Sequence, residues 1–291
     1  MKQQMIKRLL VIIWGCFCLQ MVTCAQVGVD KPAYVLYDNA GKAITYSQLI
    51  KQLEKYDVVF LGEMHNCPIT HWLEFEITRS LYHIHKDKLM LGEEMMESDN
   101  QLILNEYLQR KISYDRFEEE ARLWPNYSTD YSPVVYFAKE NKIPFIATNV
   151  PRRYANAVKN GGLEVLDSLS DEAKRYIAPL PISFNYDEKE SEAAFSMMNM
   201  MGGQKSGDNY KLAQAQAVKD ATMGWFIAHN MKDKFLHING SYHSDWKNNS
   251  EHYRKFIRSS DITSVSGRTG QSFRKYVLGC GRWLVLQKRG L

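Results

Sequence analysis

The sequence predicts an α/β protein with a mostly parallel sheet flanked by helices and with a helical cap or insertion. Short apolar runs, most of them followed by glycine or by polar residues, recur along the chain and are typical of buried parallel strands. Longer segments with helical periodicity separate these runs, as in sheets covered on both faces. The 291 residues are 45% hydrophobic and 24% charged, which suits one large globular domain.

The first 25 residues predict a signal peptide. A basic start precedes an apolar stretch at 9–17 that is short for a membrane span. Two processing routes stay open. A signal peptidase would cut before Gln26, whereas the imperfect lipobox at 21–24 would place a lipid on Cys24, and lipidation is preferred. We therefore expect export, with residues 26–291 forming a single domain whose cap lies at about 161–209.

Charge and cysteine usage exclude several classes of protein. Removal of the targeting segment takes away three basic residues and no acidic ones, so the net charge falls from +4 to about +1. With no cluster of Lys and Arg, a nucleic-acid partner is not expected. Cys67 and Cys280 lie far apart and form no C-x-x-C pair, which argues against a zinc ribbon or a disulfide scaffold. A single Cys67–Cys280 bridge is an open but less favoured alternative.

The order of the expected elements follows from the apolar pattern. A turn at 41–42 comes first. Strands are expected at 57–62, 88–93, 144–148, 235–239, 262–265 and 276–285. Helices are expected at 46–53, 69–85, 100–110, 113–121, 131–141 and from Pro151, and an amphipathic helix at 210–230. The loose stretch at 161–208, with its methionine-rich run at 197–201, is interpreted as a mostly helical cap.

Polar side chains follow four of the expected strands. They are Glu63 and His65, Glu93 and Glu94, Arg152 and Arg153, and Ser241 to Asp245 with His243. Because ligands bind at the carboxyl ends of parallel strands, we expect these residues to share one polar pocket. Charges that converge there need each other, a metal or a ligand.

Two kinds of chemistry suit this pocket. Glu63, His65, Glu93 and His243 could ligate a divalent metal ion, or they could serve acid–base catalysis in a hydrolase. The spacing does not decide between them. His71, on the following helix, either faces the same pocket or is a buried structural histidine. Nucleophile elbows, Walker loops, dinucleotide fingerprints and H-E-x-x-H motifs do not occur in the sequence.

The cap has the composition of a surface for a flat apolar ligand. Its methionines either face the core or form an adaptable apolar surface, and aromatic side chains surround them. Tyrosine is an established axial ligand of ferric haem, so such a macrocycle would suit this mixture. Composition alone does not choose the axial ligand.

The ordered motifs resemble the ChaN-like haem-binding uptake family, within a wider group that holds erythromycin-esterase-like and Tiki/TraB-like proteins. The motifs are FLGEMH at 60–65 with His71, LGEEM at 91–95 followed by Asn100-Gln101, Trp124, YSP at 131–133, ATNVPR at 147–152, AQAVKDATM at 215–223 and NGSYH at 239–243. Together they cover nearly the whole mature chain in family order.

The resemblance implies haem or iron uptake at a bacterial cell surface. It implies haem as cofactor, a homodimer that holds haem between subunits, an outer-membrane receptor as partner and a tyrosine as axial ligand. Tyr186 is the favoured ligand, and the other haem candidates are Tyr176, Tyr154, Tyr210 and Met198. A lipid anchor at the outer membrane or cell surface is expected, with the periplasm as the alternative.

The same resemblance leaves an enzymatic alternative open, because the wider group includes enzymes. In that case Glu63, His65, Glu93 and His243 would be catalytic residues of a metal-assisted esterase or protease, and the cap would be its lid. A surface lipoprotein that only contacts a receptor is the third alternative. A non-enzymatic haem-binding protein is favoured over both.

Overall fold

The computed structural model describes residues 32–38, 40–184, 209–244, 262–269 and 282–287. The chain divides into two units, Met1–Ala33 and Tyr34–Leu291, and nearly all described residues belong to the second. The expected signal peptide, Cys24 and Cys280 lie outside the described residues, so the limits of the domain stay a prediction. Within the described ranges, no helix is long and apolar enough to cross a membrane.

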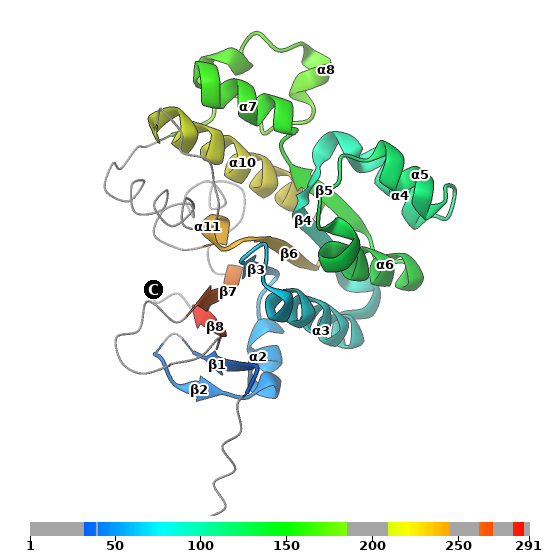
Figure 1. The fold of residues 1–291 in the computed structure, drawn as a ribbon, viewed down its shortest axis with the longest axis vertical. Helices are drawn as coiled ribbons and strands as arrows, with labels where there is room; N and C mark the ends of the chain where they lie inside the picture. Colours follow the sequence, from blue (N-terminus) through cyan, green and yellow to red (C-terminus); the bar gives the residue numbers. More distant parts are fainter. Residues whose placement is uncertain (1–31, 39, 185–208, 245–261, 270–281, 288–291) are drawn as a thin grey trace, which may run out of the picture. The chain divides into compact units, whose positions relative to one another are not determined.

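The expected α/β fold with a mostly parallel sheet is confirmed. Eight strands form one sheet in the order β2-β1-β8-β7-β3-β6-β4-β5 (Figure 1). Most neighbours are parallel; only the pairs β1–β2 and β7–β8 run antiparallel. The strands are β1 (Tyr34–Tyr37), β2 (Ala43–Ile44), β3 (Val58–Glu63), β4 (Leu89–Glu97), β5 (Phe145–Asn149), β6 (Lys234–Gly240), β7 (Ile262–Thr269) and β8 (Arg282–Gln287).

Helices lie on both faces of this sheet (Figure 1). The α-helices are α2 (Tyr46–Leu53), α3 (Pro68–His85), α4 (Gln101–Leu108), α5 (Tyr114–Glu120), α6 (Ser132–Asn141), α7 (Arg152–Gly161), α8 (Asp171–Lys174), α10 (Asn209–Asn230) and α11 (Ser241–Ser244). Shorter helical turns are η1 (Lys86–Lys88), η2 (Ser98–Asn100), η3 (Tyr127–Tyr131) and η4 (Leu163–Leu166).

Alternation along the central strands sends neighbouring side chains into two different cores. Leu61, Leu91 and Ile238 pack in the large core beneath helices α3 and α6. Phe60 and Met90 pack on the opposite face against residues of α10. Successive side chains of a strand point to opposite faces of the sheet, so two adjacent polar residues at the end of a strand also lie on opposite faces.

Helices α2 and α3 begin at residues that can cap a helix. At α2, the Thr45 hydroxyl accepts a hydrogen bond from the Gln48 amide, and the Gln48 side chain accepts one from the Thr45 amide. At α3, the sulfur of Cys67 caps the helix and Pro68 takes the first helical position, which needs no amide donor. Cys67 is a free, buried cysteine.

The sequence predictions failed at two elements. Strands β1 and β2 form a hairpin where the sequence predicted only the turn at 41–42, because the two strands are too short for a periodic signal. Helix α10 was expected to be amphipathic, but a continuous run from Ala213 to Val218 is buried between α7 and β5. The small alanine side chains in this run allow neighbouring elements to pack closely on more than one side of α10. Of the expected cap, only η4 and α8 with the chain up to 184 are described.

Candidate functional site

The carboxyl end of β3 carries the first polar cluster, on the face covered by α3. The Glu63 carboxylate accepts a hydrogen bond from the Tyr131 hydroxyl at 2.8 Å and lies 2.5 Å from Nδ1 of His65. Its second oxygen lies 2.8 Å from Nδ1 of His71. Burial would raise the pKa of Glu63, but the hydrogen bonds and charges of the two histidines outweigh it and lower the pKa. Glu63 is therefore the ionised member of this cluster.

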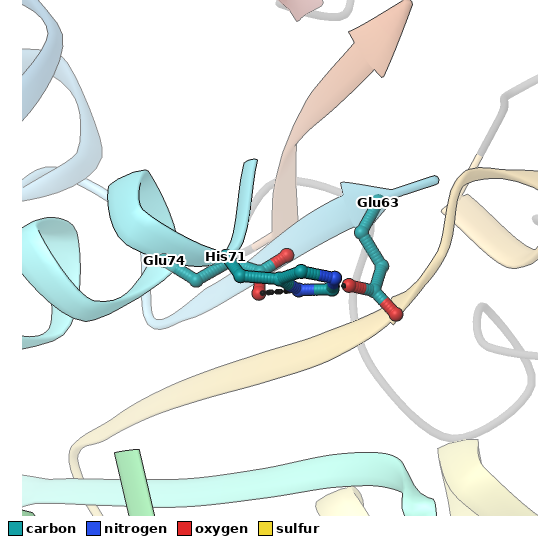
Figure 2. A group of neighbouring side chains, drawn as sticks. All are labelled: Glu63, His71 and Glu74. Carbon is teal, nitrogen blue, oxygen red and sulfur yellow. Dashed lines mark hydrogen bonds and ion pairs between the residues drawn. The ribbon is translucent and has the colours of Figure 1, made fainter. Parts of the chain in front are cut away.

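His71 places one ring nitrogen between two carboxylates. Its Nδ1 lies 2.8 Å from Glu63 and 3.2 Å from Glu74, one turn further along α3 (Figure 2). Burial would lower the pKa of His71, but these two acids raise it to about 10. Burial, followed by the Glu63 charge, raises the pKa of Glu74 to about 8. The cluster therefore carries charge that water cannot reach.

Glu93, on β4, is a further buried acid on this face. It pairs in register with Ile238, which pairs with Leu61 of β3, so Glu93 shares the face of Leu61 and Glu63. Its side chain is 0% exposed, and neither carboxylate oxygen has a hydrogen-bond partner in the part of the chain that the structure describes. Burial, and then the charges of Glu63 and Glu74, raise its pKa well above the ordinary value. Burial and the neighbouring acids therefore both favour the protonated form of Glu93.

The opposite face carries a second cluster around His243. Its Nδ1 lies 2.5 Å from Asp220 of α10, and its Nε2 lies 3.1 Å from Glu94 of β4. Burial would lower the pKa of His243, but Glu94 and Asp220 raise it to about 9. The charges of His243 and Lys219 hold the pKa of Glu94 well below its ordinary value against the effect of burial. The cluster is thus a buried network of ion pairs.

His65 connects the two clusters at the edge of the sheet. Its Nδ1 contacts Glu63, while its Nε2 lies 2.8 Å from the point where a Cβ on Gly240 would stand. That same point is 3.4 Å from Oε2 of Glu94, which accepts a hydrogen bond from the Gly240 amide. Only a residue without a side chain leaves this space open. Trp124 packs edge-on to the His65 ring at 4.7 Å.

Arginines form a rim beyond the end of β4. Arg122 binds both Glu97 and Asp99, and Arg153 binds Asp99. Arg152 is the most exposed of the three, with only a 3.6 Å approach to Glu97. This rim presents guanidinium groups to solvent at the strand ends, where anionic groups of a ligand would meet them.

The residues predicted as one metal or catalytic set are placed on both faces of the sheet. Glu63 and His65 are in contact, and Glu93 lies on the same face as Glu63. His243 lies in the other cluster, with Glu94 and Asp220 as its partners. Among the described residues, one group has ligand atoms mutually close enough to hold a metal ion, namely Glu63, His71 and Glu74.

The predicted haem ligands are only partly described, because Tyr186 and Met198 lie outside the described residues. Tyr154 is half-buried, and its hydroxyl accepts a hydrogen bond from Arg153 at 3.2 Å. Tyr176 is half-buried, and its carbonyl accepts a hydrogen bond from Ser98. Tyr210 is 47% exposed and packs edge-on against Phe184.

Sequence reasoning missed Glu74 and Asp220. Glu74 lies three residues after His71, a spacing that places both on one face of α3. That spacing was the available signal. Asp220 lies within a motif that supports the family resemblance, but only the register between α10 and the segment after β6 brings it to His243.

The comparisons with known proteins agree with this fold. The family described as haem-binding uptake, Tiki superfamily, ChaN matches residues 49–250. The chain belongs to this family. Among proteins with curated descriptions, none matches it.

Two solved structures resemble this member of the ChaN family. ChaN of Campylobacter jejuni, described for its cofacial haem binding, has a TM-score of 0.63 at 20% identity, over 88% of this chain and 97% of that chain. A variant of the erythromycin esterase EreC in its open conformation has a TM-score of 0.42 at 13% identity, over 83% of this chain and 78% of that chain. The first likeness shows that the ChaN fold extends over most of this chain.

Proposed function

We propose that this chain binds haem and serves haem or iron uptake at the cell surface. The observation that carries the proposal is membership of the haem-binding uptake family over residues 49–250. The fold likeness to ChaN of Campylobacter jejuni, a protein described with cofacial haem, supports it.

The haem ligand is proposed to come from the cap. Tyr186 remains the preferred axial ligand, with Tyr154, Tyr176, Tyr210 and Met198 as alternatives. Of the described tyrosines, Tyr154 has a guanidinium group over its ring and hydrogen-bonded to its hydroxyl. A cationic donor at that oxygen suits a negatively charged ligand atom. The exposed guanidinium of the rim arginine Arg152 is proposed to bind a haem propionate.

The cellular setting belongs to the same proposal. The basic and apolar start of the sequence supports export, and Cys24 in its imperfect lipobox supports a lipid anchor at the outer membrane. Uptake at that surface would involve an outer-membrane receptor. Cofacial haem in the Campylobacter jejuni relative supports a homodimer that shares haem between subunits. The comparisons do not favour the alternative of a metal-assisted hydrolase.

A haem titration followed by visible absorbance tests the proposal. The expected result is a saturable Soret shift with a high-spin, phenolate-type spectrum. Tyr186→Phe should weaken binding or change this spectrum, whereas Glu63→Gln, inside the sheet cluster, should leave the spectrum unchanged. If Tyr186→Phe behaves like the wild type, Tyr154→Phe, Tyr176→Phe and Tyr210→Phe identify the ligand. A folded protein that gives no shift beyond free haem would overturn the proposal.

A further inference from the structure

We propose that Glu63, His71 and Glu74 form a binding site for a divalent first-row metal ion such as Zn²⁺ or Mn²⁺. This inference is independent of haem binding, since it concerns the buried face beneath α3 and no residue of the cap. It shares only Glu63 with the set expected from the strand ends, because His71 and Glu74 stand in place of His65, Glu93 and His243.

The three side chains converge on a small volume. One ligand atom from each lies within 4.8 Å of the other two, and all three residues are buried (Figure 2). Nδ1 of His71 is 2.8 Å from Glu63 and 3.2 Å from Glu74. Ligands at about 2.0–2.2 Å from a metal ion are themselves roughly 3–3.5 Å apart. The His71–Glu74 separation lies in this range, whereas the His71–Glu63 pair is at hydrogen-bond distance and would open slightly to admit an ion. Mixed nitrogen and oxygen donors suit Zn²⁺, Fe²⁺ and Mn²⁺.

The other nitrogen of the His71 ring shows how the imidazole is oriented. Its Nε2 lies 3.4 Å from the His65 carbonyl and 3.4 Å from the Asp130 carboxylate, and both groups only accept hydrogen bonds. The proton of a neutral imidazole therefore belongs on Nε2. In the metal-free protein Nδ1 also carries a proton, which it donates to Glu63; a metal ion would displace this proton and bind the Nδ1 lone pair. A histidine that donates to a carboxylate and directs its second nitrogen to a metal is the usual arrangement in metal sites.

Unpartnered buried oxygens provide a second, independent observation. Glu74 is 2% exposed, and its Oε1 has no hydrogen-bond partner among the described residues. Glu93, on the same face, has both oxygens without a partner within the described part of the chain. Three acids and one histidine thus gather where water cannot solvate them. Protons balance this charge in the metal-free protein; a bound cation would replace them and would also join the start of α3 to the end of β3.

Metal content tests the site directly. Apo protein prepared with EDTA is mixed with ZnCl₂ or MnCl₂, and bound metal is measured after gel filtration. Stoichiometric metal in the wild type is the expected result. His71→Ala and Glu74→Gln should lose the ion, whereas the matched variants His83→Ala and Glu76→Gln, on the same helix, should retain it. Asp130→Asn should weaken binding by about ten- to hundredfold, because it removes the charged one of the two groups beside Nε2 and no metal ligand.

Thermal unfolding keeps the test decisive if a variant does not fold. Addition of ZnCl₂ or MnCl₂ to the wild-type apo protein should raise the midpoint temperature, because an ion that binds the folded state stabilises it. A wild type that takes up neither metal and shows no shift would overturn the proposal, and protons alone would then balance the cluster. Stoichiometric metal retained by both His71→Ala and Glu74→Gln would equally overturn it.

Discussion

At the scale of single residues, Gly240 decides how closely the two polar clusters approach. Its missing side chain leaves the space that the His65 ring and the Glu94 carboxylate border. Both groups hold their positions through short contacts, His65 with Glu63 and Glu94 with the Gly240 amide. A methyl group at this position would press on the ring before it met the carboxylate.

Gly240→Ala should therefore displace His65 and weaken its bond to Glu63. We expect a loss of about 1–2 kcal/mol in the free energy of unfolding, measured in urea. The His65 ring resonances should shift in a histidine NMR spectrum. Gly41→Ala is the control, because its φ of 77° disfavours alanine while no atom lies within 4 Å of the added Cβ. Unchanged His65 resonances in Gly240→Ala would contradict the prediction.

The pKa of His243 gives the molecule a pH-dependent stability. A pKa raised to about 9 from the ordinary 6.5 stabilises the fold fully below 6.5, and this contribution disappears as the pH rises through 9. The lowered pKa of Glu94 acts in the other direction, and its contribution is lost as the pH falls below the ordinary 4.5. The network is therefore most stabilising between these two ordinary values.

Asp220→Asn should remove one of the two acids that hold the His243 proton. We expect a lower pKa for His243 in an NMR titration and a loss of roughly 1–3 kcal/mol in stability near neutral pH. The loss of wild-type stability between neutral and alkaline pH should become smaller in the variant. A wild-type pKa for His243 in Asp220→Asn would show that Glu94 alone holds the proton.

The site could be predicted only as far as the strand ends allow. Glu63, His65, Glu93 and His243 were expected because a parallel sheet brings the ends of its strands together. We did not expect the site residues to be divided between the two faces of the sheet. The adjacent pair Glu93 and Glu94 already implies this division, because successive side chains of a strand point to opposite faces. Asp220 could not be predicted, because the contact depends on how α10 sits against the segment after β6.

At the scale of elements, β4 is the strand that separates the two clusters. Glu93 and Glu94 are neighbours in sequence, but they lie in different environments on opposite faces. Glu94 accepts a hydrogen bond from the Gly240 amide and forms an ion pair with His243. Glu93, in contrast, is buried and has no hydrogen-bond partner among the described residues. The register of the β4–β5 pairing shifts between Glu93 and Glu97. Beyond this irregularity, Glu97 at the end of β4 contacts the arginine rim.

Glu93→Met should stabilise the metal-free protein by about 1–3 kcal/mol, because it replaces an unpartnered buried carboxyl with an apolar side chain of similar size. A carboxyl whose pKa is raised in the folded state destabilises that state increasingly as the pH rises above the ordinary value of 4.5. The gain should therefore grow with pH in urea unfolding experiments. Glu94→Met is the contrasting variant and should be destabilising, since it leaves His243 with one acid fewer.

At the scale of the whole molecule, the sheet joins distant parts of the chain. β8 lies between β1 and β7, so the last described strand is paired with the first one. The alternation of strands and helices predicted the fold class and the central strands, since each has a long apolar run. The edge hairpin escaped prediction, because strands of four and two residues carry too little pattern.

Truncation should show how much the fold depends on this junction. A chain that ends before Arg282 lacks β8, and both β1 and β7 lose their ladder partner on that side. We expect a lower midpoint and a smaller dependence on urea concentration, because less surface becomes exposed on unfolding. A chain ended after Gln287 keeps every described strand and is the control. Equal unfolding curves for the two chains would refute the prediction.

The separation of the two clusters by β4 also has a consequence for inheritance. A point mutation at Glu93 or Glu94 alters the chemistry on one side of the sheet and leaves the other side chemically intact. A single-residue deletion in β4 ahead of Glu93 would instead exchange the sides of both acids and disrupt each cluster. Descendants of this gene can thus lose one cluster by gradual substitution while they keep the other, whereas a deletion in this part of the strand would remove both at once.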